Sequence, residues 1–389
     1  MRRNWRQLMI EEPMPNESIL LTPEQVFVTD GFPELTYVDQ AGGQPESDLK
    51  DGLAQVNKII SIVGESKTGK TTLCDKYFGK DLGKNKILVT GDRIETAYNL
   101  WSEAFRQIGE QVTSGFAHSP IGETIDRLIS RGLPVIVDDF HYVKRNVQGE
   151  VCQQMKNAAG RGLRFIVLNT PHRGDDPIRS NSDLGGRFFS VDLKFWAEDD
   201  LRQIGSKGFP KIGLKVAGDV LTMLAKEALR SPQLMQTLCL ETCRSLRQDI
   251  PYEQQEVTPA TFDLQRVMER TARSYNYTTQ LHYLREGPDE RGSPRNMFTF
   301  DDGSTGDVYN VLVRALAMDP PFLSLSFDEL EERVGEMVRA GGKPNVQRTL
   351  GYLSSLFKDG KAPLEWDSKK KLLTVVDPHF YFYLRFTGK

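Results

Sequence analysis

The sequence contains 389 residues, which exceeds the roughly 100–200 residues of a typical domain, so we expect two or three structural units. Apolar residues make up 39% and charged residues 26% of the chain, a composition typical of soluble globular proteins. The net charge of −3 excludes an overall electrostatic attraction to nucleic acids or membranes, so any such binding requires a local patch.

The sequence shows no targeting or membrane signal. Its first residues, "MRRNWRQLMIEEPMPNES", become acidic and proline-rich before any apolar stretch of about 7–15 residues begins. No window approaches the roughly 18 consecutive apolar residues of a transmembrane helix. We therefore expect a cytoplasmic protein that does not bind membranes. The scattered cysteines predict reduced, partly buried thiols. They are Cys74, Cys152, Cys239 and Cys243.

The N-terminal region, residues 1–50, is rich in proline, glycine and acidic residues. This composition predicts an arm that leads into the first domain, and not a domain of its own. One short β-like segment, "TYVDQ" at 36–40, lies within the arm.

The next region, residues 51–195, alternates apolar strand-like runs with helical patterns. Short, continuous runs of Val, Ile and Leu are typical of parallel strands that helices cover on both faces. The region therefore predicts an α/β domain with a five-stranded parallel core. The five runs span residues 58–64, 86–91, 133–139, 163–169 and 188–193.

The rest of the chain is predicted to be mainly helical. Residues 196–285 have helical periodicity and predict a small helical subdomain, whereas residues 286–304 are dense in Gly, Pro and charge and predict a linker. Residues 305–389 combine three helical stretches with two β-like runs joined by a charged turn, which are the parts of a winged helix-turn-helix. The helical stretches span 307–319, 327–340 and 345–360.

A complete phosphate-loop motif, G-x-x-x-x-G-K-[ST], follows the first apolar strand directly and precedes a helix. Backbone N–H groups of such a turn bind phosphates, Lys70 is expected to reach the β and γ oxygens, and the Thr71 hydroxyl is expected to bind Mg²⁺. The guanine-reading motif of GTPases is not found, which favours ATP. The residues expected to contact the nucleotide are Gly64, Glu65, Ser66, Lys67, Thr68, Gly69, Lys70, Thr71 and Thr72.

Two adjacent carboxylates, Asp138 and Asp139, end the apolar run "VIVDD". In nucleotide-hydrolysing sites the first carboxylate binds Mg²⁺ and the second polarises the attacking water. The alternative is a polar strand end that only caps a following helix. Because Asp139 is one methylene shorter than Glu, we expect slow or partner-dependent hydrolysis. We interpret the neighbouring His141 as a surface or supporting residue.

Two further positions are candidates for contacts to the γ-phosphate. Asn169 or Thr170, at the end of the next strand-like run, could bridge the phosphate and the attacking water, or could simply form a turn. Arg187, directly before the last run, could reach the ATP of a neighbouring subunit and neutralise charge in the transition state. Arg179 is a rival for that role, and a surface salt bridge is the alternative.

These motifs and their order resemble the AAA+/STAND superfamily of P-loop ATPases, and within it the archaeal-type and initiator-like members with a C-terminal winged helix. The resemblance covers residues 30–389 and rests on the phosphate loop, "VDDFHY", "DLGGRF", "SPQL" and "VDPHFYFYLRF". It implies that the helical subdomain is a lid over ATP, that Tyr37 packs against adenine and that Pro232 contacts the nucleotide. Arg230 replaces the first Gly of the STAND Gly-x-Pro motif, so it is either the AAA+ lid arginine or a solvent-facing residue.

The expected winged helix is either a DNA-binding or a packing and partner-binding module. In winged helices the third helix enters the major groove. Against DNA binding, the preceding helix is acidic and a lysine-rich turn is ordinary in an exposed hairpin. The candidate DNA contacts are Lys343, Gln347, Arg348, Lys369, Lys370 and Lys371.

The sequence thus favours an oligomeric switch driven by ATP and Mg²⁺, in which Arg187 acts on a neighbouring subunit. No repeat sensor or effector domain is recognisable, so the resemblance implies a separate effector or sensor protein, in bacterial defence or stress signalling. A loader or initiator on duplex DNA is the first alternative. A scaffold that binds ATP without hydrolysing it is the second.

Overall fold

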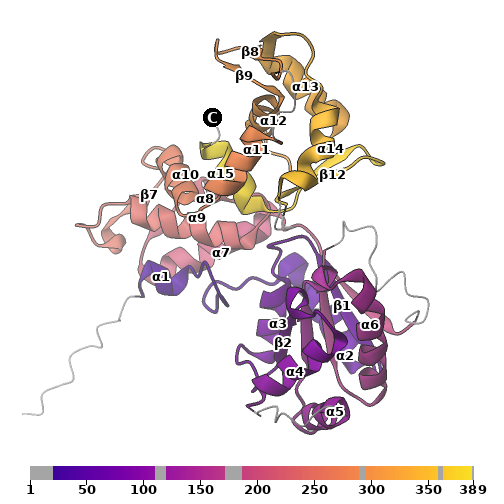
Figure 1. Ribbon diagram of the computed structural model, residues 1–389. Helices are drawn as coiled ribbons and strands as arrows, with labels where there is room; N and C mark the ends of the chain where they lie inside the picture. The colour runs from indigo at the N-terminus through magenta and orange to yellow at the C-terminus, as the bar shows by residue number, and fades with distance from the viewer. Residues whose placement is uncertain (1–20, 110–119, 171–185, 289–293, 358–361, 388–389) are drawn as a thin grey trace, which may run out of the picture.

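The computed structural model describes residues 21–109, 120–170, 186–288, 294–357 and 362–387. Figure 1 shows an α/β unit beside a helical region, with a C-terminal unit above both. Within these residues, no helix is long and apolar enough to span a membrane.

The α/β unit is built on a five-stranded sheet, as predicted. All its pairings are parallel and the strand order is β2-β3-β4-β1-β5. The order places β3 and β1 on either side of β4, so the polar residues at the carboxyl ends of these three strands meet at one edge. The strands are β1 (Ile59–Gly64), β2 (Ile87–Thr90), β3 (Val135–Asp138), β4 (Phe165–Asn169) and β5 (Phe188–Leu193).

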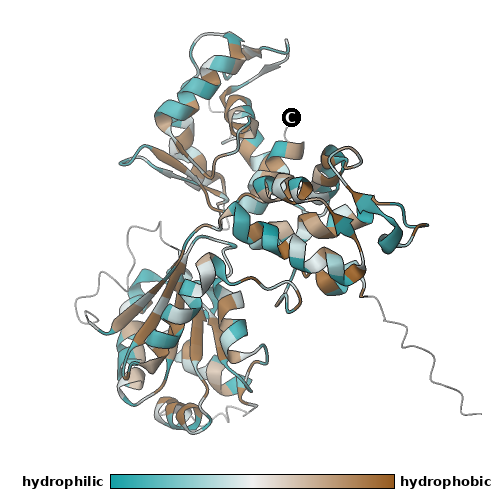
Figure 2. Cartoon of the chain, turned by 180° about the vertical axis from the view of Figure 1, so that it is seen from behind, coloured by the Kyte–Doolittle hydropathy of each residue, from teal (hydrophilic) through white to brown (hydrophobic). Residues whose placement is uncertain are grey.

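Helices cover both faces of this sheet, and the central strands β1, β3 and β4 are apolar on both sides for that reason. In β3, Val135 and Val137 are buried in the cluster on one face, whereas Ile136 is buried in the cluster on the other. The hydropathy colouring of Figure 2 shows the strands as mostly apolar. One face is covered by α4 (Ala97–Gln107), α5 (Pro120–Ser130) and α6 (Arg145–Gly160). The other is covered by α2 (Gln44–Ala54) and α3 (Lys70–Phe78).

The N-terminal arm differs from its prediction. Residues 36–40 form a turn and extended backbone and pair with no described strand, so the expected β-segment is wrong. The arm contains α1 (Pro23–Val26) and η1 (Gln40–Gly43), and α2 then crosses the expected boundary between residues 50 and 51. Phe27 belongs to the core of the helical region, whereas Leu49 in α2 belongs to the core of the α/β unit. The arm therefore joins the two units.

Residues 196–285 form the predicted helical region. The N-terminal end of α9 follows directly from the sequence, because the Ser231 hydroxyl accepts a hydrogen bond from the Leu234 amide at 3.2 Å and Pro232 occupies the first turn. A short parallel pair of strands, β6 (Lys215–Val216) and β7 (Glu256–Val257), was not predicted. The helices are α7 (Glu198–Gly208), α8 (Gly218–Glu227), α9 (Pro232–Ser245), α10 (Leu264–Arg273) and α11 (Thr278–Glu286), with 3₁₀ turns η5 (Phe209–Ile212) and η6 (Tyr252–Gln254).

The C-terminal unit contains the three helices and the hairpin predicted for residues 305–389. A strand that was not predicted, β10, completes a three-stranded sheet of order β10-β13-β12. A final helix, α15, then packs against α10. The elements are α12 (Val308–Ala317), β10 (Ser324–Ser326), α13 (Phe327–Met337), α14 (Val346–Leu356), β12 (Leu364–Asp367), β13 (Leu372–Val375) and α15 (Pro378–Thr387).

Two predictions for this part of the chain are wrong. The expected linker, residues 286–304, contains β8 (Phe298–Phe300), and the helix expected to reach residue 340 ends at Met337 and continues as β11 (Val338–Ala340). With β9 (Thr305–Gly306) these strands form a small antiparallel sheet of order β11-β8-β9. β8 and β9 pair locally as a hairpin, whereas β8 and β11 pair across a long sequence separation, so neither of those two segments identifies the other as its partner.

The helical region and the C-terminal unit share one continuous hydrophobic cluster. The buried Arg385 of α15 also links them, since its guanidinium pairs with Glu227 of α8 at 2.9 Å and with Asp319 at 2.6 Å. The C-terminal unit is therefore packed onto the helical region and is not a separate body on a linker.

Candidate nucleotide-binding site

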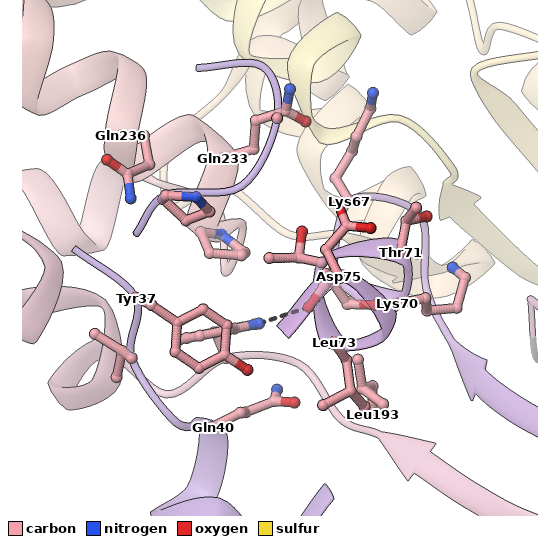
Figure 3. A pocket seen from close by; sticks show the side chains of 18 of the residues that line it. Tyr37, Gln40, Lys67, Lys70, Thr71, Leu73, Asp75, Leu193, Gln233 and Gln236 are labelled. Atoms are coloured by element: carbon pink, nitrogen blue, oxygen red, sulfur yellow. Dashed lines mark hydrogen bonds between the residues drawn. The ribbon is translucent and has the colours of Figure 1, made fainter. Parts of the chain in front are cut away.

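A cavity with a volume of about 540 Å³ lies at the carboxyl edge of the parallel sheet. This is within the range of about 300–1,000 Å³ typical of small-molecule sites. Its walls come from the phosphate loop, the N-terminal arm and helix α9, as Figure 3 shows. Three segments far apart in the sequence thus form one site.

The phosphate loop is the turn between β1 and α3. Gly69, at the N-terminus of α3, has a φ of 98°, a conformation that glycine adopts without steric cost. The amine of Lys70 donates to the carbonyl oxygens of Gly64 at 2.8 Å and Glu65 at 2.9 Å. Gly64 and Glu65 are not among the residues that line the cavity, and their carbonyl groups hold the Lys70 amine in place. The loop residues that line the cavity are Ser66, Lys67, Thr68, Gly69, Lys70, Thr71 and Thr72.

Lys70 is buried and lies in an electrostatically mixed environment. Burial lowers the pKa of its amine, while the charges of Asp138, Asp139 and Glu65 act in the opposite direction. A bound phosphate would add negative charge beside this amine and favour its protonated form. The loop therefore fits an anionic ligand.

Thr71 and Asp138 are in direct contact, since the Thr71 hydroxyl donates to a carboxylate oxygen of Asp138 at 3.0 Å. Burial and the adjacent charge of Asp139 raise the pKa of Asp138. In the described part of the chain, no group of three or more His, Cys, Asp or Glu side chains could hold a metal by itself. The pair fits Mg²⁺, because this ion is usually held by one or two side chains together with substrate phosphates and water.

Asp139 lines the cavity and has an unusual backbone conformation. Its φ and ψ are 52° and 45°, in the left-handed region, where Asp is one of the more tolerated residues. The residue precedes the 3₁₀ turn η3 (Phe140–Tyr142), but its side chain makes no capping hydrogen bond there. The alternative, in which Asp139 only caps a following helix, is therefore not supported.

The backbone of Asp139 packs closely against Gly91, which begins η2 (Gly91–Arg93) after strand β2. A Cβ atom at Gly91 would lie 2.2 Å from the carbonyl oxygen of Asp139. Only a glycine allows this approach without a shift of the Asp139 backbone.

Asn169 and Thr170 end β4 and both remain candidates for a phosphate contact. Thr170 lines the cavity. Asn169 does not, but it is 5% exposed and its amide nitrogen has no hydrogen-bond partner among the described residues. A buried donor without a partner is uncommon in proteins, so Asn169 has a donor available to a ligand or water.

Tyr37 lines the cavity from the arm. Its hydroxyl donates to Glu46 at 2.7 Å, its ring stacks on Phe32 with centroids 5.4 Å apart, and the Lys76 amine lies 4.1 Å from its centroid. Trp196, between β5 and α7, donates from its indole nitrogen to the Thr68 carbonyl at 2.8 Å. The phosphate loop is thus hydrogen-bonded to the start of the helical region.

Helix α9 contributes Pro232, Gln233 and Gln236 to the cavity. The two glutamines also bind the arm, since Gln233 donates to the carbonyl of Thr29 at 2.7 Å and Gln236 donates to the hydroxyl of Thr36 at 2.8 Å. Arm and helical region therefore form one wall of the site.

Two of the arginines expected near the site, Arg230 and Arg187, are not wall residues of the cavity. Arg230 is exposed and its guanidinium lies 5.7 Å from the ring centroid of Phe195. Arg187 stands directly before β5, at the amino edge of the sheet, and is not a wall residue of the chain's own cavity. His141 is half-buried beside Tyr142. Arg179 lies outside the described residues.

The residues that the sequence did not reveal come from the arm and the joint to the helical region. Gln40, Glu46 and Trp196 all line the cavity, together with the two α9 glutamines described above. Of these residues, Gln40 lies in a segment that the sequence analysis singled out, because it is the last residue of "TYVDQ" at 36–40. The others lack any local motif.

Comparison with known proteins agrees with this geometry. Residues 54–173 match the family described as AAA domain. Among solved structures, a Walker-type ATPase of Pyrococcus abyssi is similar, with 16% identity, 88% of this chain and 94% of that chain covered, and a TM-score of 0.54. The ORC2 protein of Aeropyrum pernix, in ADPNP and ADP complexes, has 14% identity, coverage of 93% and 96%, and a TM-score of 0.53. No curated protein matches the sequence.

The fold and the matched domain define the class of protein. The chain has the fold of AAA+ P-loop ATPases, with a phosphate loop and an acidic strand at the carboxyl edge of its parallel sheet. The predicted P-loop core and the helical region that follows it are confirmed.

Proposed function

We propose that this protein binds ATP with Mg²⁺, hydrolyses it slowly and acts as an oligomeric switch that controls a partner protein. The observation that supports this most is the composite cavity, to which the phosphate loop, the arm and helix α9 all contribute. A ligand that contacts all three segments favours one arrangement of the α/β unit relative to the helical region. Because the C-terminal unit is packed onto the helical region, the arrangement extends to it.

The chain's own residues have distinct roles in this proposal. Lys70 neutralises the β and γ phosphates, while Thr71 and Asp138 hold Mg²⁺. When bound, Mg²⁺ supplies positive charge that stabilises the phosphate oxygens during transfer. Asp139 orients the attacking water, and Asn169 or Thr170 assists at the γ-phosphate.

Slow turnover follows from the acidic residue itself. The Asp139 carboxylate reaches one methylene less far than a glutamate would, and its backbone position is set by the contact with Gly91. A nucleophile positioned less directly reacts more slowly. In a single-turnover assay we expect phosphate release that Asp139→Asn abolishes. An absence of phosphate release by the wild-type protein would instead support the non-hydrolysing scaffold.

Oligomer formation is proposed to complete the site through Arg187. The residue stands at the amino edge of the sheet, opposite the carboxyl edge that forms the cavity, so it cannot serve its own nucleotide. Arg164 provides a matched control, because it stands directly before β4 at the same edge and, like Arg187, accepts a strand amide hydrogen bond through its carbonyl, at 2.9 Å in both cases.

Gel filtration with and without ATP and Mg²⁺ tests the switch. We expect a nucleotide-dependent increase in size that Arg187→Ala removes and Arg164→Ala retains. A wild-type chain that stays monomeric under all conditions contradicts the proposal. So does an Arg187→Ala variant that assembles normally.

A second candidate is a DNA-associated loader, which the C-terminal unit favours. We propose that α12, α13, α14 and the β12–β13 hairpin form a winged helix. Gln347 and Arg348 are exposed on α14, and Lys369, Lys370 and Lys371 are exposed on the hairpin turn. Against this candidate, Lys343 is already paired with Glu331 at 2.9 Å.

Salt-dependent duplex binding tests the loader. Replacement of the three hairpin lysines by glutamate is expected to weaken binding and to reduce its dependence on salt. Undetectable duplex binding at low salt excludes this candidate.

A further inference from the structure

The cavity has a polar end that the phosphate loop does not form. Gln40 lines it and is 5% exposed. In Figure 3 Gln40 lies next to Tyr37, across the cavity from Gln233 and Gln236. Its amide nitrogen donates to the carbonyl oxygen of Lys194.

This contact fixes the orientation of the Gln40 amide. A carbonyl oxygen only accepts hydrogen bonds, so the nitrogen of the amide must face Lys194 and the oxygen must face away from it. That oxygen, Oε1, is buried and has no hydrogen-bond partner among the residues that the structure describes. A residue of the cavity wall therefore has a buried acceptor that lacks a donor.

Glu46 adds a second acceptor at this end. One carboxylate oxygen accepts the Tyr37 hydroxyl at 2.7 Å. The other, Oε2, is buried and has no partner in the described ranges. Two buried acceptors disfavour phosphate at this position and favour a neutral group that carries N–H donors.

We infer that Gln40 determines base specificity, because its Oε1 accepts a hydrogen bond from the exocyclic amine of adenine, with Glu46 as a second acceptor for that amine. This inference rests on the proposed function, which places a nucleoside triphosphate in the cavity. Adenine carries an amine at position 6, whereas hypoxanthine carries a carbonyl oxygen there. A carbonyl opposite Gln40 Oε1 leaves two acceptors facing each other, and buried sites reject such pairs strongly.

Competition between ATP and ITP on the full chain tests the inference. We expect the wild-type protein to bind ATP about tenfold or more tightly than ITP. Gln40→Leu, which removes one of the two acceptors, is expected to lower the ratio of the two Kd values severalfold, with Glu46 retaining the remainder. Gln40→Met serves the same purpose if the leucine variant does not fold. The ratio compares two ligands on one protein, so a general loss of stability cancels.

Gln236 provides a matched control. It is also a buried glutamine of the cavity wall, at 3% exposure, but its amide nitrogen donates to the Thr36 hydroxyl at 2.8 Å and its amide oxygen lies 3.2 Å from the same hydroxyl. Gln236→Leu is therefore expected to keep the wild-type ratio. Lys70→Ala is expected to lose both nucleotides.

The outcomes separate this inference from the proposed function. Equal wild-type affinity for ATP and ITP, with both lost in Lys70→Ala, overturns the role of Gln40 and leaves nucleotide binding intact. An unchanged ratio in Gln40→Leu overturns it as well. GTP also carries donors at its base edge, and tighter binding of GTP than of ATP overturns the adenine assignment. Binding of no nucleotide overturns the proposed function itself.

Discussion

At the scale of single residues, the acidic pair illustrates how local sequence and distant packing combine. Asp138 and Asp139 follow an apolar strand and are found by sequence. The backbone conformation of Asp139, however, depends on Gly91, which is distant in sequence and meets it only because β2 and β3 are neighbours. Gly91 is therefore a positioning residue for the carboxylate.

Replacement of Gly91 by alanine tests whether this glycine positions Asp139. In Gly91→Ala the new Cβ must displace the Asp139 backbone, and misplacement of a reacting group by about 1 Å can cost on the order of 10²-fold in rate. We expect single-turnover hydrolysis to fall at least about tenfold while the Kd for ATP changes little.

Gly149 in α6 is the control for this prediction. A Cβ there meets no atom within 4 Å, so Gly149→Ala is expected to retain wild-type hydrolysis and to stabilise the helix by about 0.5–1 kcal/mol. Equal rates in the two variants would contradict the positioning role of Gly91.

His379, at the start of α15, predicts a specific pH dependence. It is 4% exposed, stacks on Tyr275 with centroids 4.7 Å apart, and its Nε2 lacks a partner within the described structure. Burial lowers its pKa to about 4, Lys67 acts in the same direction and Asp377 opposes them.

The folded pKa of His379 thus lies below the unfolded value of about 6.5. Its contribution to stability is complete above pH 6.5 and is lost as the pH falls toward 4. Between pH 7 and 5 we expect the free energy of unfolding to drop by about 2 kcal/mol through this residue. Urea unfolding of His379→Gln should show a smaller drop than the wild type. The variant of the exposed His282, His282→Gln, should show the same drop as the wild type.

At the scale of elements, α15 carries the junction between the helical region and the C-terminal unit. The Arg385 side chain is 4% exposed, but its partners differ, because Glu227 is 22% and Asp319 is 68% exposed. Removal of the guanidinium leaves the partly buried Glu227 carboxylate without its charge partner. The exposed Asp319 carboxylate is solvated by water and loses little.

We therefore expect Arg385→Met, which keeps much of the side-chain volume, to destabilise this junction by about 1–3 kcal/mol. Thermal unfolding measures the change. Arg273→Met serves as the control, because Arg273 is 78% exposed and 3.9 Å from Glu269, and such surface pairs contribute little. A loss in the control equal to that in Arg385→Met would refute the role of the junction.

The strands also show what a local sequence pattern can and cannot predict. The five strands were predicted correctly because each is a short, mostly apolar run between helical patterns. The segment 36–40 has a similar local pattern but forms no strand, since Thr36 and Tyr37 bind Gln236 and Glu46 instead. Pattern alone does not reveal whether a neighbouring strand exists.

At the scale of the whole molecule, the hydrophobic clusters divide the chain differently from the predicted domains. One cluster joins the arm, the helical region and the C-terminal unit, and two clusters lie on the faces of the parallel sheet. The cavity lies where these bodies meet, so we expect its occupancy and the arrangement of the bodies to be coupled.

The sequence by itself determined the features that adjacent residues encode. Strand, glycine turn and helix N-terminus are consecutive in the phosphate loop, so Lys70 and Thr71 could be assigned from the motif. The acidic pair could be assigned because a parallel sheet brings its carboxyl strand ends together.

Only the tertiary structure decided what meets across long separations. It brought Gln40 and Glu46 to the end of the cavity that the phosphate loop does not form, set Gly91 against Asp139 and placed part of the expected linker in a small sheet. The physical reason is that such contacts depend on which surfaces pack together, and packing leaves no periodic pattern in either partner's sequence.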